Sequence, residues 1–350
     1  MNNFINIDGK KIGDGCDPFI IAELSANHNG DISRAIEILE MSKKAGADAL
    51  KIQTYTQDTL TIDSDRDDFL IKGGLWDGRT LYSLYKEAHM PWDWHYELFK
   101  KAKEIDITIF SSPFDETAID FLEDLNAPAY KIASFEAIDL SLIRYAASTN
   151  KPLIISTGMA DADEISEAVN AAREAGCKQL ALLHCVSGYP ALPEDYNLAT
   201  LSDMANRYDA VIGISDHTID NTTSIAAVAL GAKIIEKHVT LNRSDGGPDD
   251  SFSLEPNDLR ELCMLSKVAR KSIGSINYAR KESEKGNIVS RRSLYSVKDI
   301  KCGEIISKKN VKSIRPGYGL LPKYLDEIVG RKASQDISKG TPISLDLLLE

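Results

Sequence analysis

The chain has 350 residues, 43% of them hydrophobic and 27% charged, which is typical of a globular protein and excludes a disordered one. Its net charge of −12 argues against a nucleic-acid partner, because a phosphate backbone repels an acidic surface. The apolar runs are too short to cross a membrane and the first residues lack the apolar core of a secretory signal, so we expect a cytoplasmic protein that does not associate with membranes. The five cysteines form no C-x-x-C pair, so we expect reduced thiols.

Short β-rich runs recur along the chain, and a stretch with helical periodicity follows each of them. The runs are 18–24, 49–54, 107–112, 129–134, 152–157, 179–185, 210–215 and 232–238. Eight such units predict an α/β fold, a (β/α)8 TIM barrel, which we assign to residues 1–272. A doubly wound open sheet is the alternative, but no G-x-G-x-x-G motif follows the first run.

The segment between the second run and its helix, residues 55–91, is unusually long and contains Trp76, Tyr82 and Tyr85. An excursion after a barrel strand commonly contributes to the active-site wall. We expect that role here. The alternative is a segment that packs on the protein surface and takes no part in the site.

The chain changes character after residue 272. Residues 273–292 are polar and basic and indicate a linker, whereas residues 293–350 contain short runs separated by glycines, which predicts a small β-rich domain. Residues 281–350 carry 14 Lys and Arg against 9 Asp and Glu, a net charge of +5, and residues 1–280 therefore carry −17. So small a domain buries little core, and we expect it to lean on a partner surface.

Two lysines lie inside predicted strands, where an unpaired ammonium is costly. Lys51 and Lys131, with Ser134, Ser156 and Ser215 at neighbouring strand ends, predict a pocket for a phosphate or a carboxylate. Pairing with a structural glutamate is one alternative. A Schiff-base lysine is another, but it would need a single isolated amine.

Two histidines, His217 and His238, end adjacent predicted strands, so their rings can approach a common point. Two imidazoles with waters or substrate oxygens suit a divalent ion such as Mn²⁺, Co²⁺, Mg²⁺ or Zn²⁺. Catalytic zinc usually has three protein ligands, which favours a six-coordinate ion with open positions. Each histidine taken alone could equally be a hydrogen-bonded core residue.

Several motifs together resemble those of the sialic acid synthase family. They are AELSANHNG (22–30), LKIQTY (50–55), SSPFDE (111–116), YKIASFE (130–136), ISTGM (155–159), LHCVSGYP (183–190), GISDHT (213–218), EKHVTL (236–241) and GPDDSFSLEP (247–256). Residues 293–350, with SIRPGYG (313–319), resemble the antifreeze-like (SAF) domain of that family. The pseudaminate-forming branch is the most similar, and Ser187 stands where neuraminate-forming members have Asn.

The resemblance implies the condensation of phosphoenolpyruvate with an open-chain amino sugar, in this branch 2,4-diacetamido-2,4,6-trideoxy-altrose, to give a nine-carbon keto acid and phosphate. It places Glu23 and Glu136 at the reacting centre and a divalent metal, Mn²⁺ or else Mg²⁺ or Co²⁺, on His217 and His238. The implied phosphoenolpyruvate ligands are Lys51, Ser112, Lys131, Ser134, Ser156, Ser187 and Ser215. The implied sugar ligands are Gln53, Tyr189, Asp249 and Arg315, the last from another subunit, which implies a domain-swapped homodimer.

Three other hypotheses fit parts of the sequence. The same reaction could use another sugar, N-acetylmannosamine or the legionaminate precursor. The C-terminal domain alone would suit a non-catalytic carbohydrate-binding or ice-binding protein, although that leaves the lysines and histidines unexplained. A metal-dependent aldolase that uses pyruvate would consume pyruvate without releasing phosphate.

Overall fold

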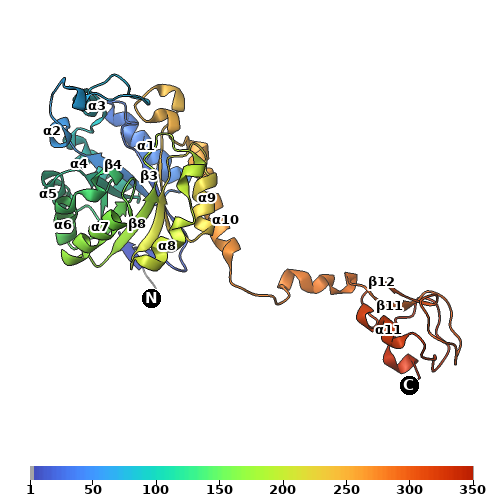
Figure 1. The fold of residues 1–350 in the computed structure, drawn as a ribbon. Helices are drawn as coiled ribbons and strands as arrows, with labels where there is room; N and C mark the ends of the chain where they lie inside the picture. Colours follow the sequence, from blue (N-terminus) through green and yellow to red (C-terminus); the bar gives the residue numbers. More distant parts are fainter. Residues whose placement is uncertain (1–3, 350) are drawn as a thin grey trace. The chain divides into compact units, whose positions relative to one another are not determined.

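The structure, a computed structural model, describes residues 4–349, and the chain divides into two compact units, one ending at Gly274 and the other beginning at Ser275 (Figure 1). In the first unit eight parallel strands close into a barrel in the order β10-β3-β4-β5-β6-β7-β8-β9. The strands are β3 (Phe19–Glu23), β4 (Ala49–Thr54), β5 (Thr108–Pro113), β6 (Tyr130–Ile132), β7 (Leu153–Ser156), β8 (Leu180–Cys185), β9 (Val211–Ser215) and β10 (Ile234–His238). Seven of the eight predicted runs contain one of these strands and the run 107–112 covers all of β5 but its last residue, which confirms the barrel.

Helices follow the strands and surround the barrel (Figure 1). They are α1 (Ile32–Ala45), α2 (Gln57–Leu60), α3 (Leu81–Ala88), α4 (Trp92–Glu104), α5 (Glu116–Asp124), α6 (Leu140–Ser148), α7 (Ala162–Glu174), α8 (Thr200–Arg207), α9 (Thr222–Ala229) and α10 (Pro256–Ile273). Local sequence sets their ends: Asp161 and Glu164 form a capping box at the start of α7, and Gly46 adopts φ 99° just beyond α1, a conformation that favours glycine.

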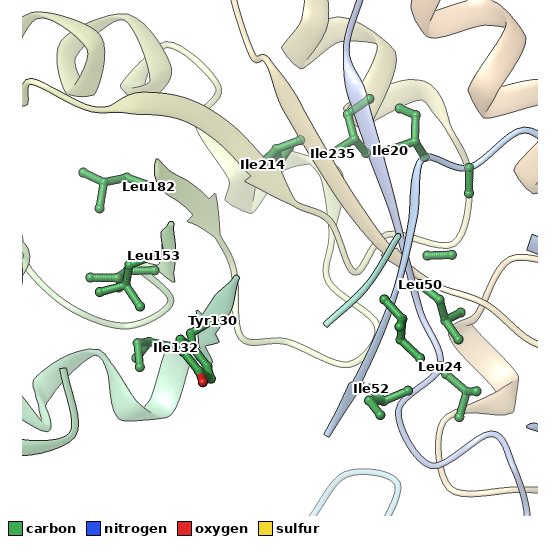
Figure 2. Close-up of a cluster of buried hydrophobic side chains, with 14 of the residues drawn as sticks. Ile20, Leu24, Leu50, Ile52, Tyr130, Ile132, Leu153, Leu182, Ile214 and Ile235 are labelled. Carbon is green, nitrogen blue, oxygen red and sulfur yellow. The ribbon is translucent and has the colours of Figure 1, made fainter. Parts of the chain in front are cut away.

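The strands alternate between two apolar environments. Outward side chains, among them Ile20, Leu50 and Tyr130, pack with the helices in one large cluster (Figure 2). Inward side chains such as Phe19 and Phe110 form a second cluster inside the barrel. This alternation with period two is the geometry of a β-strand, and it fixes which residues can reach the barrel interior.

A hairpin precedes the barrel and closes one end of it. Strands β1 (Phe4–Ile7) and β2 (Lys10–Gly13) pair antiparallel. Their buried Ile5, Ile7 and Ile12 join the interior cluster, which is built from residues near the N-terminal ends of the barrel strands. The N-terminal half of the barrel is therefore filled with apolar side chains, and polar groups can gather only toward the C-terminal ends of the strands.

The C-terminal unit has a core of its own. Strands β11 (Ser293–Ser296) and β12 (Val311–Ile314) form a two-stranded sheet, and the short helix α11 (Leu325–Ile328) packs nearby. Leu294, Ile306 and Ile343 lie in its buried apolar cluster. Residues 274–292, which precede this sheet, are exposed throughout. Across residues 4–349, none of the helices combines the length and the apolar character needed to span a bilayer.

Candidate active site

The inward residues of the barrel strands change from apolar to polar along the chain direction. On β3, Phe19 and Ile21 are followed by Glu23, and on β10, Ile234 is followed by Glu236 and His238. The same alternation places polar inward side chains of the other strands on the C-terminal side of the apolar cluster inside the barrel. Together these polar ends surround a cavity of about 450 Å³, a size usual for small-molecule sites.

Two buried lysines share one carboxylate at the base of this cavity. Glu236 Oε1 lies 3.3 Å from Lys131 Nζ and 3.5 Å from Lys51 Nζ, and all three side chains are at most 5% exposed. Lys51 Nζ is also 2.9 Å from Glu23 Oε2 and donates to Ser112 Oγ at 3.1 Å. We call Lys51, Lys131 and Glu236 the charged floor.

The charged floor holds its lysines in unequal environments. Burial lowers the pKa of Lys131, and Glu236 offsets that effect only in part. Burial would also lower the pKa of Lys51, but its two carboxylate neighbours outweigh burial and raise it. Burial raises the pKa of Glu236, but the two lysines outweigh that effect and lower it. The carboxylate is thus ionised, and the two amines that flank it can bind an incoming anion.

Hydroxyl groups surround the charged floor. Ser156 Oγ is buried and has no hydrogen-bond partner within residues 4–349, and it lines the cavity, so it is free to bind a ligand oxygen. Ser215 donates to Glu236 at 3.4 Å, and Ser134 exchanges a 2.9 Å hydrogen bond with Ser187. Ser134, Ser156 and Ser215 line the cavity, whereas Ser112 and Ser187 do not; Ser112 accepts a hydrogen bond from Lys51, and Ser187 shares one with Ser134.

A further carboxylic acid faces the cavity from the short 3₁₀ helix after β6. Glu136 lies in the 3₁₀ segment Ser134–Ile138, and burial raises the pKa of its carboxyl to about 7. At neutral pH this group can therefore both give up and accept a proton, which is the property that a general acid or base needs.

The two histidines meet as predicted. The ring centroids of His217 and His238 are 5.3 Å apart, and both line the cavity. His217 Nδ1 lies 2.8 Å from the Val186 carbonyl, which can only accept, so Nδ1 carries the proton and Nε2 is left with a lone pair. Burial lowers the pKa of His217 to about 4 and that of His238 well below its usual value, so both rings are neutral at pH 7.

Neutral imidazoles with free lone pairs fit a divalent metal. His238 Nδ1 is buried without a hydrogen-bond partner within residues 4–349, and it lies 3.8 Å from the Asp249 carboxylate. The described residues hold no group of three or more His, Cys, Asp or Glu side chains placed to bind an ion together. An ion here would therefore take two protein ligands and leave its other positions to water or substrate.

Two of the predicted sugar ligands, Gln53 and Asp249, are linked by hydrogen bonds through Ser25. Gln53 donates to Glu23 at 2.8 Å and to Ser25 at 3.0 Å, and Ser25 in turn donates to Asp249 at 2.6 Å. Tyr189 packs on His217 with centroids 4.4 Å apart. Gln53, Tyr189 and Asp249 all line the cavity. Arg315 belongs to the C-terminal unit and is exposed there.

Comparison with known proteins gives the family. A family model described as "NeuB family" matches residues 38–278, and one described as "SAF domain" matches residues 291–349. This chain belongs to the NeuB family.

Relatives within the NeuB family differ in their similarity to this chain. The "Pseudaminic acid synthase" of Campylobacter jejuni serotype O:23/36 is 45% identical over 322 residues, 92% of this chain and 94% of that protein. The "N,N'-diacetyllegionaminic acid synthase" of Campylobacter jejuni serotype O:2 is 36% identical over 321 residues, 91% and 96% of the two chains. A crystal structure of N-acetylneuraminic acid synthetase from Leptospira borgpetersenii matches with a TM-score of 0.74 at 31% identity, over 82% of this chain and 96% of that one.

Two residues of this NeuB barrel carry more of the site than the sequence indicated. Glu236 joins both lysines, and its position two residues before His238 on one strand was the signal that it faces inward. Tyr196 is fully buried; its hydroxyl accepts from the His217 backbone N–H at 2.8 Å and donates to the Ser215 carbonyl at 2.9 Å. No local pattern in the sequence marks Tyr196, because its partners lie about twenty residues away.

Proposed function

We propose that the chain is a pseudaminic acid synthase, which condenses phosphoenolpyruvate with 2,4-diacetamido-2,4,6-trideoxy-altrose to give pseudaminate and phosphate. The observation that carries the proposal is the charged floor beside two neutral histidines in a single cavity. The higher identity to a pseudaminic acid synthase than to a legionaminic acid synthase, 45% against 36%, favours this acceptor.

The floor suits phosphoenolpyruvate because that substrate brings a phosphate and a carboxylate. Lys51 and Lys131 supply two buried cations, and the partnerless hydroxyl of Ser156 supplies a further donor. Charge-assisted hydrogen bonds of this kind are short and strong. Ser134 and Ser215 add hydroxyls around the same anion, while Ser112 positions Lys51 and Ser187 positions Ser134 through one hydrogen bond each.

The reaction forms one carbon–carbon bond and, at carbon 2, forms a carbon–oxygen bond to water and breaks the carbon–oxygen bond to phosphate. Carbon 3 of phosphoenolpyruvate attacks the aldehyde carbon, whose oxygen takes up a proton; water adds to carbon 2, and phosphate leaves. Glu23 and Glu136 supply negative charge beside carbon 2 while it is electron-poor. Glu136, with its pKa near 7, can take the proton of the water. A divalent ion on His217 and His238, Mn²⁺ or else Mg²⁺ or Co²⁺, supplies Lewis acidity when bound.

The proposal includes a domain-swapped homodimer in which Arg315 of one subunit reaches the acceptor in the other. Arg315 is exposed in its own unit and has exposed apolar neighbours, Ile314 and Tyr318. The charges of +5 on residues 281–350 and −17 on residues 1–280 favour docking of opposite surfaces. Because phosphoenolpyruvate is made and used in the cytoplasm, we assign the enzyme to that compartment.

The test is an acceptor panel on the chelator-stripped full chain with phosphoenolpyruvate and Mn²⁺. Released phosphate and the product mass are measured with the diacetamido-trideoxy altrose, the legionaminate precursor and N-acetylmannosamine. Phosphate together with a nine-carbon keto acid from the first sugar supports the proposal. Preference for either of the other sugars refutes the assigned acceptor, and consumption of pyruvate without phosphate release refutes the reaction.

A further inference from the structure

A second wall of the cavity is apolar and comes almost entirely from the excursion between β4 and α4. Six of its side chains line the cavity: Leu60, Ile71, Trp76, Leu81, Leu84 and Tyr85. Leu84 is buried, whereas the other five are partly exposed. We call these six residues the apolar wall.

Specific contacts hold the apolar wall against the rest of the site. Trp76 Nε1 donates to the Pro248 carbonyl at 3.2 Å, and its ring lies 6.0 Å from that of Tyr189, which packs on His217. At the other side, Tyr85 packs edge-on against Tyr55 with centroids 6.0 Å apart. The wall is thus continuous with the face of the cavity that carries the histidines. Phe252 is buried against His238, with ring centroids 5.1 Å apart, and does not line the cavity.

The apolar wall has no use in binding phosphoenolpyruvate, whose charged groups are matched by the charged floor. Large apolar side chains that face a water-filled cavity gain free energy only when a ligand covers them. A hydroxyl group placed against them would lose its hydrogen bonds to water without replacement. The wall therefore belongs to the second substrate and selects against hydroxyls in the part of it that the wall contacts.

We propose that the apolar wall is the subsite for the methyl-bearing groups of the acceptor, its deoxygenated carbon 6 and its acetamido methyls. It makes the enzyme prefer a deoxygenated, N-acetylated sugar over one with a hydroxyl on each carbon. The inference rests on the proposed function, because it assumes that an amino sugar is the second substrate. Beyond that function, the inference names the residues that contact the sugar and the apolar contacts by which they recognise it.

The test compares two leucines of the same excursion. Leu81→Asn places an amide in the apolar wall, and Leu75→Asn makes the same change at a side chain that is 50% exposed and does not line the cavity. Leu81→Met keeps the wall apolar. For each full-length variant, kcat/KM is measured for the diacetamido-trideoxy altrose and for N-acetylmannosamine, together with the KM for phosphoenolpyruvate.

Leu81→Asn should lower kcat/KM for the deoxygenated acceptor by at least about tenfold relative to N-acetylmannosamine, since small apolar contacts discriminate by roughly 10–200-fold. Its KM for phosphoenolpyruvate should stay unchanged, which also shows that the barrel is folded. Leu75→Asn should behave as the unaltered chain, and Leu81→Met should keep the preference of the unaltered chain for the deoxygenated acceptor over N-acetylmannosamine. If Leu81→Asn keeps the wild-type acceptor preference while the chain still makes pseudaminate, the subsite is wrong and the proposed function stands. If the unaltered chain releases no phosphate with the deoxygenated acceptor, both are wrong.

Discussion

Replacing Glu236 with glutamine tests how the charged floor is stabilised. The change keeps the shape of the side chain but removes the negative charge between Lys51 and Lys131. At separations of 3.5 and 3.3 Å and an effective dielectric constant near 20, each attraction amounts to about 5 kcal/mol before desolvation is counted. Lys51 keeps Glu23 at 2.9 Å, but Lys131 has no other ion-pair partner within 4.0 Å among residues 4–349. Leaving one buried charge unpaired typically costs about 3–5 kcal/mol, and we expect a loss of unfolding free energy in that range at pH 7.

Urea unfolding followed by tryptophan fluorescence measures this loss directly. All three tryptophans, Trp76, Trp92 and Trp94, lie in the barrel unit, so the signal does not report on the C-terminal unit. Because burial lowers the pKa of Lys131, raising the pH removes the charge of the unpaired ammonium in the variant. The difference in unfolding free energy between the variant and the unaltered chain should therefore become smaller as the pH rises. Phosphoenolpyruvate should also reduce this difference in unfolding free energy, since its anionic groups replace the missing carboxylate and bind only the folded state.

The control is Glu97→Gln, a change of the same chemistry at an exposed position of α4. It should alter stability by less than about 0.5 kcal/mol. A Glu236→Gln variant as stable as this control, or one that phosphoenolpyruvate does not stabilise further, would refute the account of the floor given above.

Four further results are expected. His217→Ala should abolish Mn²⁺-dependent phosphate release and weaken Mn²⁺ binding measured by electron paramagnetic resonance, with an unchanged circular dichroism spectrum; full turnover after chelation would contradict the metal site. Tyr196→Phe removes the hydroxyl that fixes the segment carrying His217 and should weaken Mn²⁺ binding by about 10–100-fold; unaltered affinity would show that Tyr196 does not position the ligand. Activity should rise with pH through about 7 as Glu136 deprotonates, and the Glu136→Gln variant should have low activity without this rise. If the variant shows the same rise with pH, the rise belongs to another group. Arg315→Ala should raise the acceptor KM, and mixing it with a Lys131→Ala subunit should restore some activity only if the domains are swapped.

The fold was predictable from sequence because the barrel repeats one simple pattern. Each unit has an apolar run followed by a helix, and helix caps such as Asp161 and Gly46 mark the boundaries locally. The inward face of each strand could also be read, because side chains alternate with period two. Lys51, Lys131, His217 and His238 were predictable as cavity residues for that reason, and the structure brings them together.

The remaining features depend on contacts that no local pattern contains. Glu236 has its importance because strands β4, β6 and β10 bring three charges to one point across the barrel. Ser112 and Ser187 are one contact removed from the cavity, a difference that strand position alone does not show. The apolar wall is formed by an excursion without regular periodicity, so its side chains could be assigned to the cavity only from the structure.

The N-terminal hairpin has a consequence for the order in which the site fills. With Ile5, Ile7 and Ile12 sealing the lower half of the barrel, traffic to the charged floor passes through the open end above it. Gln53 follows Lys51 by two residues toward the C-terminal end of β4, so an acceptor bound as proposed above would stand between the floor and that end of the barrel. If the chain has the function proposed above, we therefore expect the anion that binds to the lysines to enter before the sugar, and the products to leave through the same opening.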